Sequence, residues 1–170
     1  MKYLIVVDMQ KDFVTGVLGT KEAQAIVPAV ANRVMEAISN GWQVIFTKDT
    51  HNPDTYASTL EGQKLPVLHC SEGTDGWNLV PELSDFTAGC QVLKKYTFGS
   101  STLPQLLLDA DEVEFCGVCT GICVISNVAV VRAFYPNLPI KVNEKLCACV
   151  TPDSHRTAIE AMKTFQIEVI

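Results

Sequence analysis

A cysteine-rich segment near the middle of the chain carries the strongest chemical signal. Cys119 and Cys123 lie in the run Gly-Val-Cys-Thr-Gly-Ile-Cys at residues 117–123. This run follows an apolar, β-branched stretch at 113–118 and opens an apolar stretch with helical spacing at 122–134. A cysteine at such a junction lies on the first turn of a helix, where unpaired N–H groups and the helix dipole favour a negative charge. We therefore expect a lowered thiol pKa and a thiolate nucleophile there.

An acid and a lysine stand at other positions where strands are expected to end. Asp8 follows an apolar run at 3–7, and Lys94 and Lys95 close a run at 91–95. Adjacent residues on a strand point to opposite faces, so only one of the two lysines can enter a shared site. A lysine near a thiol stabilises the thiolate and can orient an acid. Acid, lysine and cysteine together suggest a catalytic triad.

A second constellation has the residue types of a metal site. Asp49 and His51 are two residues apart at the end of an apolar run, and His69 follows in a segment without clear periodicity. Two neutral imidazoles and a carboxylate suit zinc, iron or manganese, with water in the remaining positions. Histidines in loops often form only hydrogen bonds. The spacing alone is therefore compatible with a metal site and with histidines that bind no metal.

The rest of the chain supplies the elements that would position these groups. The patterns predict six strands, at residues 3–7, 44–47, 91–95, 112–118, 139–142 and 167–170. They predict helices at residues 25–38, 103–108, 122–134 and 152–165, and a long functional insertion at about 50–85. Strands that alternate with helices imply right-handed crossovers and a parallel sheet covered on both faces. Ligands of such sheets bind beyond the carboxyl ends of the strands, which is where the candidate residues fall.

Size and composition limit the class of protein. A chain of 170 residues predicts one domain, 1–170, and its 48% hydrophobic and 19% charged residues are ordinary for a globular protein. A net charge of −6 without a basic stripe argues against nucleic-acid binding. No apolar run is long enough for a membrane span, and no secretion signal is evident at residues 1–9. Seven cysteines without a disulfide-like spacing favour a reduced, cytoplasmic protein.

The remaining cysteines have simpler interpretations. Cys116 and Cys149 are expected to be small buried hydrophobic residues. Cys116-x-x-Cys119 could be a redox pair, but it straddles a strand end instead of opening a helix. Cys147-x-Cys149 could join it in a zinc knot, but the first pair falls on a buried strand. Both alternatives are disfavoured.

Several motifs, in order, give the chain a family resemblance. Residues 7–13 (VDMQKDF) look like a D-x-Q-x-D-F signature, residues 95–100 (KYTFGS) like a lysine segment, and residues 117–124 like a nucleophile segment. Residues 69–74 and 81–83 also match. The chain thus resembles the isochorismatase-like cysteine hydrolases, in particular their nicotinamidase/pyrazinamidase branch. The resemblance implies a three-layer α/β/α fold with a mainly parallel six-stranded sheet of Rossmann-like topology, and a protein that self-associates into a homo-oligomer.

The resemblance also assigns roles within the triad. It implies that Asp8 is the general base, Lys95 its partner and Cys123 the nucleophile, with Lys94 left in solvent. It places a cis peptide bond before Cys119, which would turn the N–H of Cys119 toward that of Cys123 and form an oxyanion hole. Phe13 would be an apolar wall for a flat ring.

For the metal site, the resemblance implies a divalent ion held by Asp49, His51 and His69, with zinc favoured over iron or manganese. The fourth ligand varies among relatives. Glu61 is the first candidate here, and Asp54 is the second. The bound ion would orient a small amide substrate.

Two departures and three rival functions accompany this interpretation. Gly121 stands where the family often has Asp, and Pro66 stands where nicotinamidases often have an aromatic residue, so Trp77 or Tyr56 would have to replace that wall. Beside hydrolysis of nicotinamide, the residues allow hydrolysis of another carbamoyl or ureido amide, or a catalytically silent interaction domain. Hydrolysis of the isochorismate vinyl ether is disfavoured because it need not use a cysteine.

Overall fold

The sheet of this protein has all six strands parallel, in the order β3-β2-β1-β4-β5-β6. A computed structural model describes all residues, 1–170. The strands are β1 (Lys2–Val7), β2 (Gln43–Asp49), β3 (Gln91–Lys95), β4 (Glu112–Val118), β5 (Ile140–Ala148) and β6 (Glu168–Val169). The order reverses direction on either side of β1, so the carboxyl ends of β1 and β4 form the switch point where ligands of such sheets bind.

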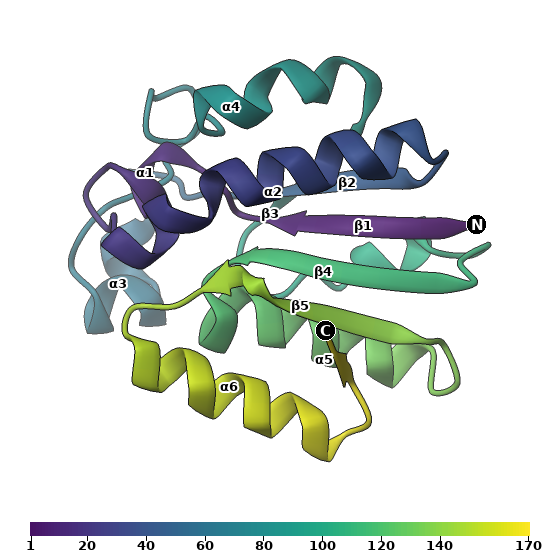
Figure 1. The fold of residues 1–170 in the computed structure, drawn as a ribbon. Helices are drawn as coiled ribbons and strands as arrows, with labels where there is room; N and C mark the ends of the chain where they lie inside the picture. Colours follow the sequence, from purple (N-terminus) through teal and green to yellow (C-terminus); the bar gives the residue numbers. More distant parts are fainter.

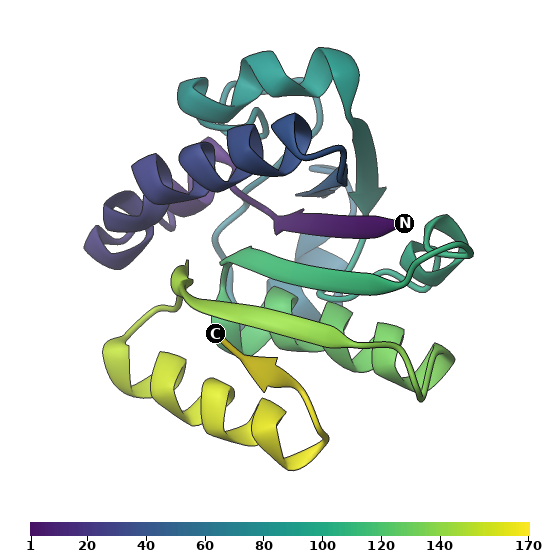
Figure 2. The same cartoon turned by 45° about the vertical axis from the view of Figure 1, so that its right-hand side comes forward.

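Helices cover both faces of this sheet (Figures 1 and 2). The α-helices are α1 (Lys11–Val14), α2 (Lys21–Ser39), α3 (Leu60–Lys64), α4 (Pro81–Ser84), α5 (Ile125–Phe134) and α6 (Pro152–Thr164). Helices α2 and α4 pack on one face, and α5 and α6 on the other. The expected three-layer α/β/α architecture is therefore confirmed. No helix combines the length and the apolar character needed to cross a membrane.

The apolar pattern of each strand explains this arrangement. Strands β1 and β4 are buried almost throughout because they are central and covered on both sides. Two cores result, one under α2 and one under α5 and α6. The edge strand β3 has mostly exposed side chains, and Lys95 at its end is the buried exception.

Four predicted elements differ from the structure. The helix predicted at 25–38 begins at Lys21, because the Thr20 hydroxyl accepts a hydrogen bond from the Ala23 N–H and caps it. The helix predicted at 103–108 is a short 3₁₀ turn (η3, Leu103–Leu106). The strand predicted at 139–142 continues to Ala148 as β5. The helix predicted at 122–134 is a π-helical turn (η4, Thr120–Val124) followed by α5.

The segment between β2 and β3 has little regular structure. It contains α3, α4 and two 3₁₀ turns, η1 (Tyr56–Ser58) and η2 (Asp85–Gly89). The His51 N–H, two residues after the end of β2, donates to the Cys70 carbonyl at 3.0 Å and so holds this later part of the segment beside the strand end. This connection brings residues 51, 61 and 69 over the carboxyl ends of the strands.

Gly117 is required where β4 approaches β1. Its φ is +114°, and a Cβ at this position would lie 2.2 Å from the carbonyl oxygen of Val7. We expect Gly117→Ala to lower the free energy of unfolding by at least about 3 kcal/mol, because backbone strain and overlap add. The matched control is Gly41→Ala: Gly41 also has a positive φ (+74°), but a Cβ there meets nothing within 4 Å. In this variant the free energy of unfolding should fall by only about 1 kcal/mol. Urea unfolding measures both variants. An equal decrease in the free energy of unfolding for Gly117→Ala and Gly41→Ala would contradict the requirement for glycine at position 117.

Candidate active site

Three side chains from different elements meet beyond the ends of the central strands. The Lys95 ammonium lies 2.7 Å from Asp8 Oδ2 and 3.5 Å from Cys123 Sγ. Asp8 follows β1, Lys95 ends β3, and Cys123 lies in the turn η4 after β4. All three residues are at least 95% buried. The lysine thus joins the carboxylate and the thiol in one buried cluster, as the sequence motifs predicted.

Asp8 has one oxygen that is fixed and one that is free to receive a proton. The Thr47 hydroxyl donates to Asp8 Oδ1 at 2.6 Å. Asp8 Oδ2 forms the ion pair with Lys95 but accepts no well-aligned hydrogen bond. Burial raises the pKa of Asp8, although the Lys95 charge opposes this rise. A carboxylate of raised pKa with a free oxygen is suited to general base catalysis.

Lys95 is held by a second carboxylate and a carbonyl. Its ammonium lies 3.0 Å from Asp49 Oδ1 and 3.1 Å from the carbonyl oxygen of Thr97. Burial alone would lower the pKa of Lys95, but the charges of Asp8, Cys123 and Asp49 outweigh it and raise the pKa, so the group stays an ammonium. Lys94 points away and pairs with the exposed Glu72, so the two lysines have opposite orientations, as expected.

The Cys123 thiol differs from the sequence-based expectation. Burial and the nearby Asp8 charge raise the pKa of Cys123, and Lys95 only partly offsets them. The prediction of a lowered pKa at a helix start was wrong because the thiol lies in an enclosed site with two carboxylates. The resting group is therefore a neutral thiol, which needs a base at the moment of reaction.

The peptide bond between Val118 and Cys119 is cis, as the resemblance implied. The Cys119 N–H donates to no other group of the protein, so it is free to bind a ligand atom. The oxyanion hole formed with the Cys123 N–H stays a prediction.

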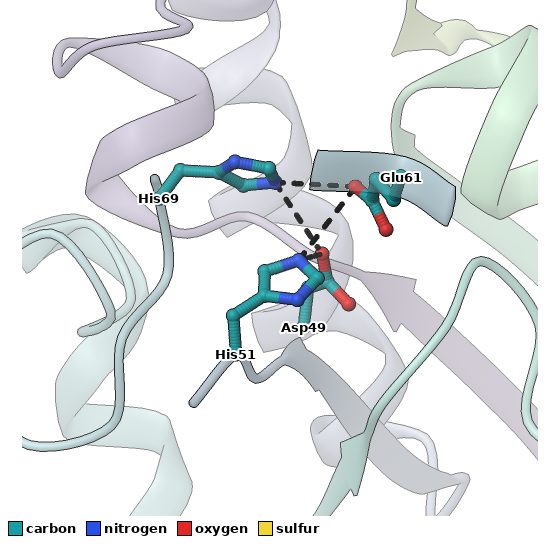
Figure 3. Close-up of side chains that lie close together, drawn as sticks. All are labelled: Asp49, His51, Glu61 and His69. Atoms are coloured by element: carbon teal, nitrogen blue, oxygen red, sulfur yellow. Dashed lines mark hydrogen bonds and ion pairs between the residues drawn. The ribbon is translucent and has the colours of Figure 1, made fainter. Parts of the chain in front are cut away.

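Four side chains form a candidate divalent-metal site next to Lys95 (Figure 3). The Nε2 atoms of His51 and His69 lie 3.0 and 3.8 Å from Asp49 Oδ2, and 3.7 and 3.5 Å from Glu61 Oε1. Four ligands about 2.1 Å from a tetrahedral ion are themselves separated by roughly 3.4 Å, so these spacings fit such an ion.

The hydrogen bonds around this cluster also fit a metal. His69 Nδ1 lies 2.8 Å from the Val67 carbonyl oxygen and must donate to it, which leaves the lone pair of Nε2 free for an ion. Asp49 is positioned by Gln10, whose side chain accepts from the Asp49 N–H at 2.7 Å. Of the two candidates for the fourth position, Glu61 belongs to the cluster, and Asp54 is exposed and lies outside it.

An open cavity of about 820 Å³ leads from the surface to Cys123 and to the histidine cluster. Its wall is largely apolar and includes Phe13, Leu60, Tyr96, Phe98, Ile122 and Val150. Neither Trp77 nor Tyr56 belongs to this wall, so the suggestion that one of them replaces the missing aromatic residue was wrong. Tyr56 instead packs edge-on against His51 and His69, and Trp77 packs under Lys48. Phe13 does line the cavity and contacts the edge of the His69 ring.

Several positioning residues escaped the sequence analysis. Asn127 donates to the Cys123 carbonyl at 2.8 Å and accepts from the Ser100 N–H at 2.9 Å, and so ties the nucleophile turn to the lysine segment. Thr47 and Gln10 hold Asp8 and Asp49 as described above. Gln10 is part of the quoted opening motif, which was the one signal for it. A buried Thr and Asn inside apolar runs carried no distinctive pattern.

Comparison with known proteins shows the family to which the chain belongs. The model of the Isochorismatase domain matches residues 2–170. The nicotinamidase/pyrazinamidase of Mycobacterium tuberculosis is 30% identical over 187 residues, which cover 100% of this chain and 98% of that protein. The crystal structure of pyrazinamidase/nicotinamidase from Streptococcus mutans superposes with a TM-score of 0.90 at 28% identity and covers both chains fully. N-carbamoylsarcosine amidase from Thermoplasma acidophilum gives a TM-score of 0.82 at 27% identity, over 99% of this chain and 94% of that one.

Proposed function

This chain belongs to the isochorismatase family, and from that premise we propose that it is a cysteine amidohydrolase that converts nicotinamide to nicotinate and ammonia. The observation that carries the proposal is the Lys95 ammonium in contact with both the Asp8 carboxylate and the Cys123 thiol. The similarity to nicotinamidase/pyrazinamidases along the whole chain supports the choice of substrate.

The reaction begins with proton transfer from the Cys123 thiol to Asp8 Oδ2, the carboxylate oxygen that accepts no hydrogen bond. Lys95 stabilises the thiolate as it forms, and the sulfur attacks the amide carbonyl. The Cys119 and Cys123 amides receive the developing oxyanion. Protonated Asp8 then gives its proton to the leaving ammonia, which leaves a thioester on Cys123. Asp8 next activates a water molecule that releases the carboxylic acid.

The histidine cluster has a separate role in this proposal. Asp49, His51, Glu61 and His69 would hold a divalent ion, zinc in the first place and iron or manganese as alternatives. When bound, the ion would supply a Lewis-acidic position for the ring nitrogen of the substrate and so orient it. Phe13 would pack against the ring and exclude water from the reacting carbon.

A second candidate reaction is hydrolysis of a small carbamoyl or ureido amide. The structural similarity to N-carbamoylsarcosine amidase is nearly as extensive as that to the nicotinamidases. The same thiol, base and amides would serve this chemistry, because only the group attached to the carbonyl differs.

Ammonia release from a panel of amides tests the proposal directly. The panel consists of nicotinamide, pyrazinamide and N-carbamoylsarcosine, each with and without a chelator. We expect the highest kcat/KM for nicotinamide. A preference for the carbamoyl compound would move the assignment to the second reaction. Release from none of the three, by folded and metal-reconstituted protein, would overturn the amidase assignment.

Metal binding is predicted to depend on His69. We expect His69→Ala to weaken zinc binding by at least ~100-fold, since even groups that only support a metal ligand are worth 10- to 100-fold in affinity. Asp54→Asn is the matched control, because Asp54 lies in the same segment but outside the cluster. Equilibrium dialysis followed by elemental analysis measures both variants without a turnover assay. Equal zinc content in the two variants would contradict the proposed metal site.

The unpaired cysteines also bear on where in the cell the enzyme acts. All seven cysteines are unpaired. Unpaired cysteines in this number fit the reducing conditions of the cytoplasm, where we propose that the enzyme acts.

A further inference from the structure

Two cysteines that the proposed reaction does not use as nucleophiles lie just beyond the carboxyl ends of the neighbouring strands β4 and β5. Strands β4 and β5 pair Gly117 with Cys147 and Val118 with Ala148. Cys119 and Cys149 are the first residues after these two strands. Neighbouring strands are about 4.8 Å apart, and disulfides join residues whose Cα atoms are about 4.4–6.8 Å apart. The register of β4 and β5 therefore brings the two residues that follow the last pair side by side.

The two thiols also contact each other. Cys119 donates a hydrogen bond to the sulfur of Cys149. The Cys149 sulfur also lies near Ser154 and the backbone amides of Gly121 and Val150, which favour its negatively charged form. Ser154 lies in the first turn of α6, a 13-residue helix whose N-terminus favours a negative charge. Gly121 has no side chain to occupy this space, and a Cβ there would lie 3.4 Å from the Cys149 sulfur.

This environment gives Cys149 a pKa shift opposite to that of the other buried thiols. The hydrogen bond from Cys119, followed by those from Ser154 and the amides, lowers the pKa of Cys149 to about 5, although burial opposes the shift. Burial raises the pKa of Cys116 and of Cys147. The sequence-based interpretation of Cys149 as a small hydrophobic residue was therefore incomplete, since its sulfur is buried and polar at once.

The cavity gives small oxidants a route to the pair. Cys119 is partly exposed and belongs to the cavity wall, next to Val150. Cys149 does not line the cavity and is 3% exposed. A molecule the size of hydrogen peroxide that enters the cavity would reach Cys119 at the wall and, through it, the neighbouring Cys149.

We propose that Cys119 and Cys149 form a redox-active dithiol that a peroxide converts to an intramolecular disulfide. The Cys149 thiolate attacks one peroxide oxygen, the O–O bond breaks, and the departing hydroxide takes up a proton to become water. Cys149 is then a sulfenic acid. The Cys119 sulfur attacks the sulfenic sulfur, the S–O bond breaks, and the second hydroxide leaves as water with the Cys119 proton. Two thiols are oxidised, and one peroxide is reduced to two waters.

The disulfide would affect the neighbouring site. Cys119 supplies one of the two amides assigned to the oxyanion, so a bond that fixes its side chain to Cys149 would change the position of that amide. We expect oxidation to lower turnover at least about tenfold, since one oxyanion donor is worth more than that. This consequence, unlike the disulfide itself, rests on the proposed function.

Thiol counting and peptide mapping test the pair without a turnover assay. Treatment of the folded chain with a small excess of hydrogen peroxide should lower the free thiols from seven to five, because a disulfide consumes two. Cleavage after lysine and arginine should then release peptide 96–132 joined to peptide 146–156. Dithiothreitol should restore both peptides and all seven thiols.

Two variants decide which cysteine of the second peptide takes part. Cys149→Ala should abolish the joined peptides, and the matched Cys147→Ala, in the same peptide, should retain them. A joined product in Cys149→Ala, a disulfide within peptide 96–132, or seven free thiols after peroxide would each overturn the proposal. A protein that forms the disulfide but cleaves no amide before or after reduction would count against the proposed function and not against the pair.

Discussion

Cys123→Ala should abolish amide hydrolysis, with kcat lowered by at least roughly 10⁴-fold, because the variant has no sulfur to form the thioester. The rest of the site is held independently of this side chain: Lys95 keeps its contacts with Asp8 and Asp49, and Asn127 bonds the backbone carbonyl of residue 123. The variant should therefore still fold and bind substrate. Ammonia release measures the first effect, and circular dichroism with calorimetric titration of nicotinamide measures the other two.

The control for this experiment is Cys90→Ala. Cys90 is also unpaired and partly buried, but it lies before β3 and outside the cavity. Its removal should leave kcat within about twofold of the parent chain, as is usual for a site away from the chemistry. If Cys123→Ala retained turnover within tenfold of the parent, a covalent mechanism through this cysteine would be excluded.

Asp8→Asn should lower kcat by roughly 10²–10⁴-fold, the usual contribution of a positioned general base. The Cys123 thiol is neutral at rest, so the loss of its proton acceptor cannot be compensated by a preformed thiolate. The change should appear in kcat and not in KM, because Asp8 is 0% exposed and is assigned proton transfer and not the binding of the substrate ring. Steady-state ammonia release over a range of nicotinamide concentrations separates the two constants.

Thr47→Val provides a graded comparison for Asp8. It removes the 2.6 Å hydrogen bond to Asp8 Oδ1 but leaves Oδ2 in place. A hydrogen bond to a charged group contributes about 1.5–3 kcal/mol, so we expect a loss smaller than that of Asp8→Asn. An Asp8→Asn variant with unchanged kcat would assign proton transfer to another group.

The sequence predicted the sheet because each strand is an apolar run followed by a turn or a helix. It also predicted that Asp8, Asp49, Lys95 and Cys123 share one edge, since parallel strands end on the same side. Local capping and irregular turns were harder to predict. The cap at Thr20, the 3₁₀ turn at Leu103–Leu106 and the π-helical turn at Thr120–Val124 each involve local hydrogen bonds that leave the apolar periodicity unchanged.

The electrostatics of the site could not be predicted from local sequence. A cysteine at a helix start predicted a lowered pKa, but the pKa depends on Asp8 and on burial, which come from distant parts of the chain. The reverse holds for Cys149, which resembled an ordinary core residue until its contacts with Ser154 and Gly121 were known. Glu61 could be preferred over Asp54 only through the family resemblance, because the fold of residues 50–80 decides which carboxylate reaches the histidines.

The ammonium of Lys95 also has a mechanical consequence. Strand β3 is the outermost strand on its side and pairs only with β2, where Asp49 stands directly opposite Lys95. Lys95 forms ion pairs with Asp8, which follows the central strand β1, and with Asp49, which ends β2. These ion pairs connect the edge strand β3 to the centre of the sheet. The same ammonium that is proposed to act in catalysis therefore also stabilises the sheet. A substitution of Lys95 should lower both activity and the stability of the β3 edge.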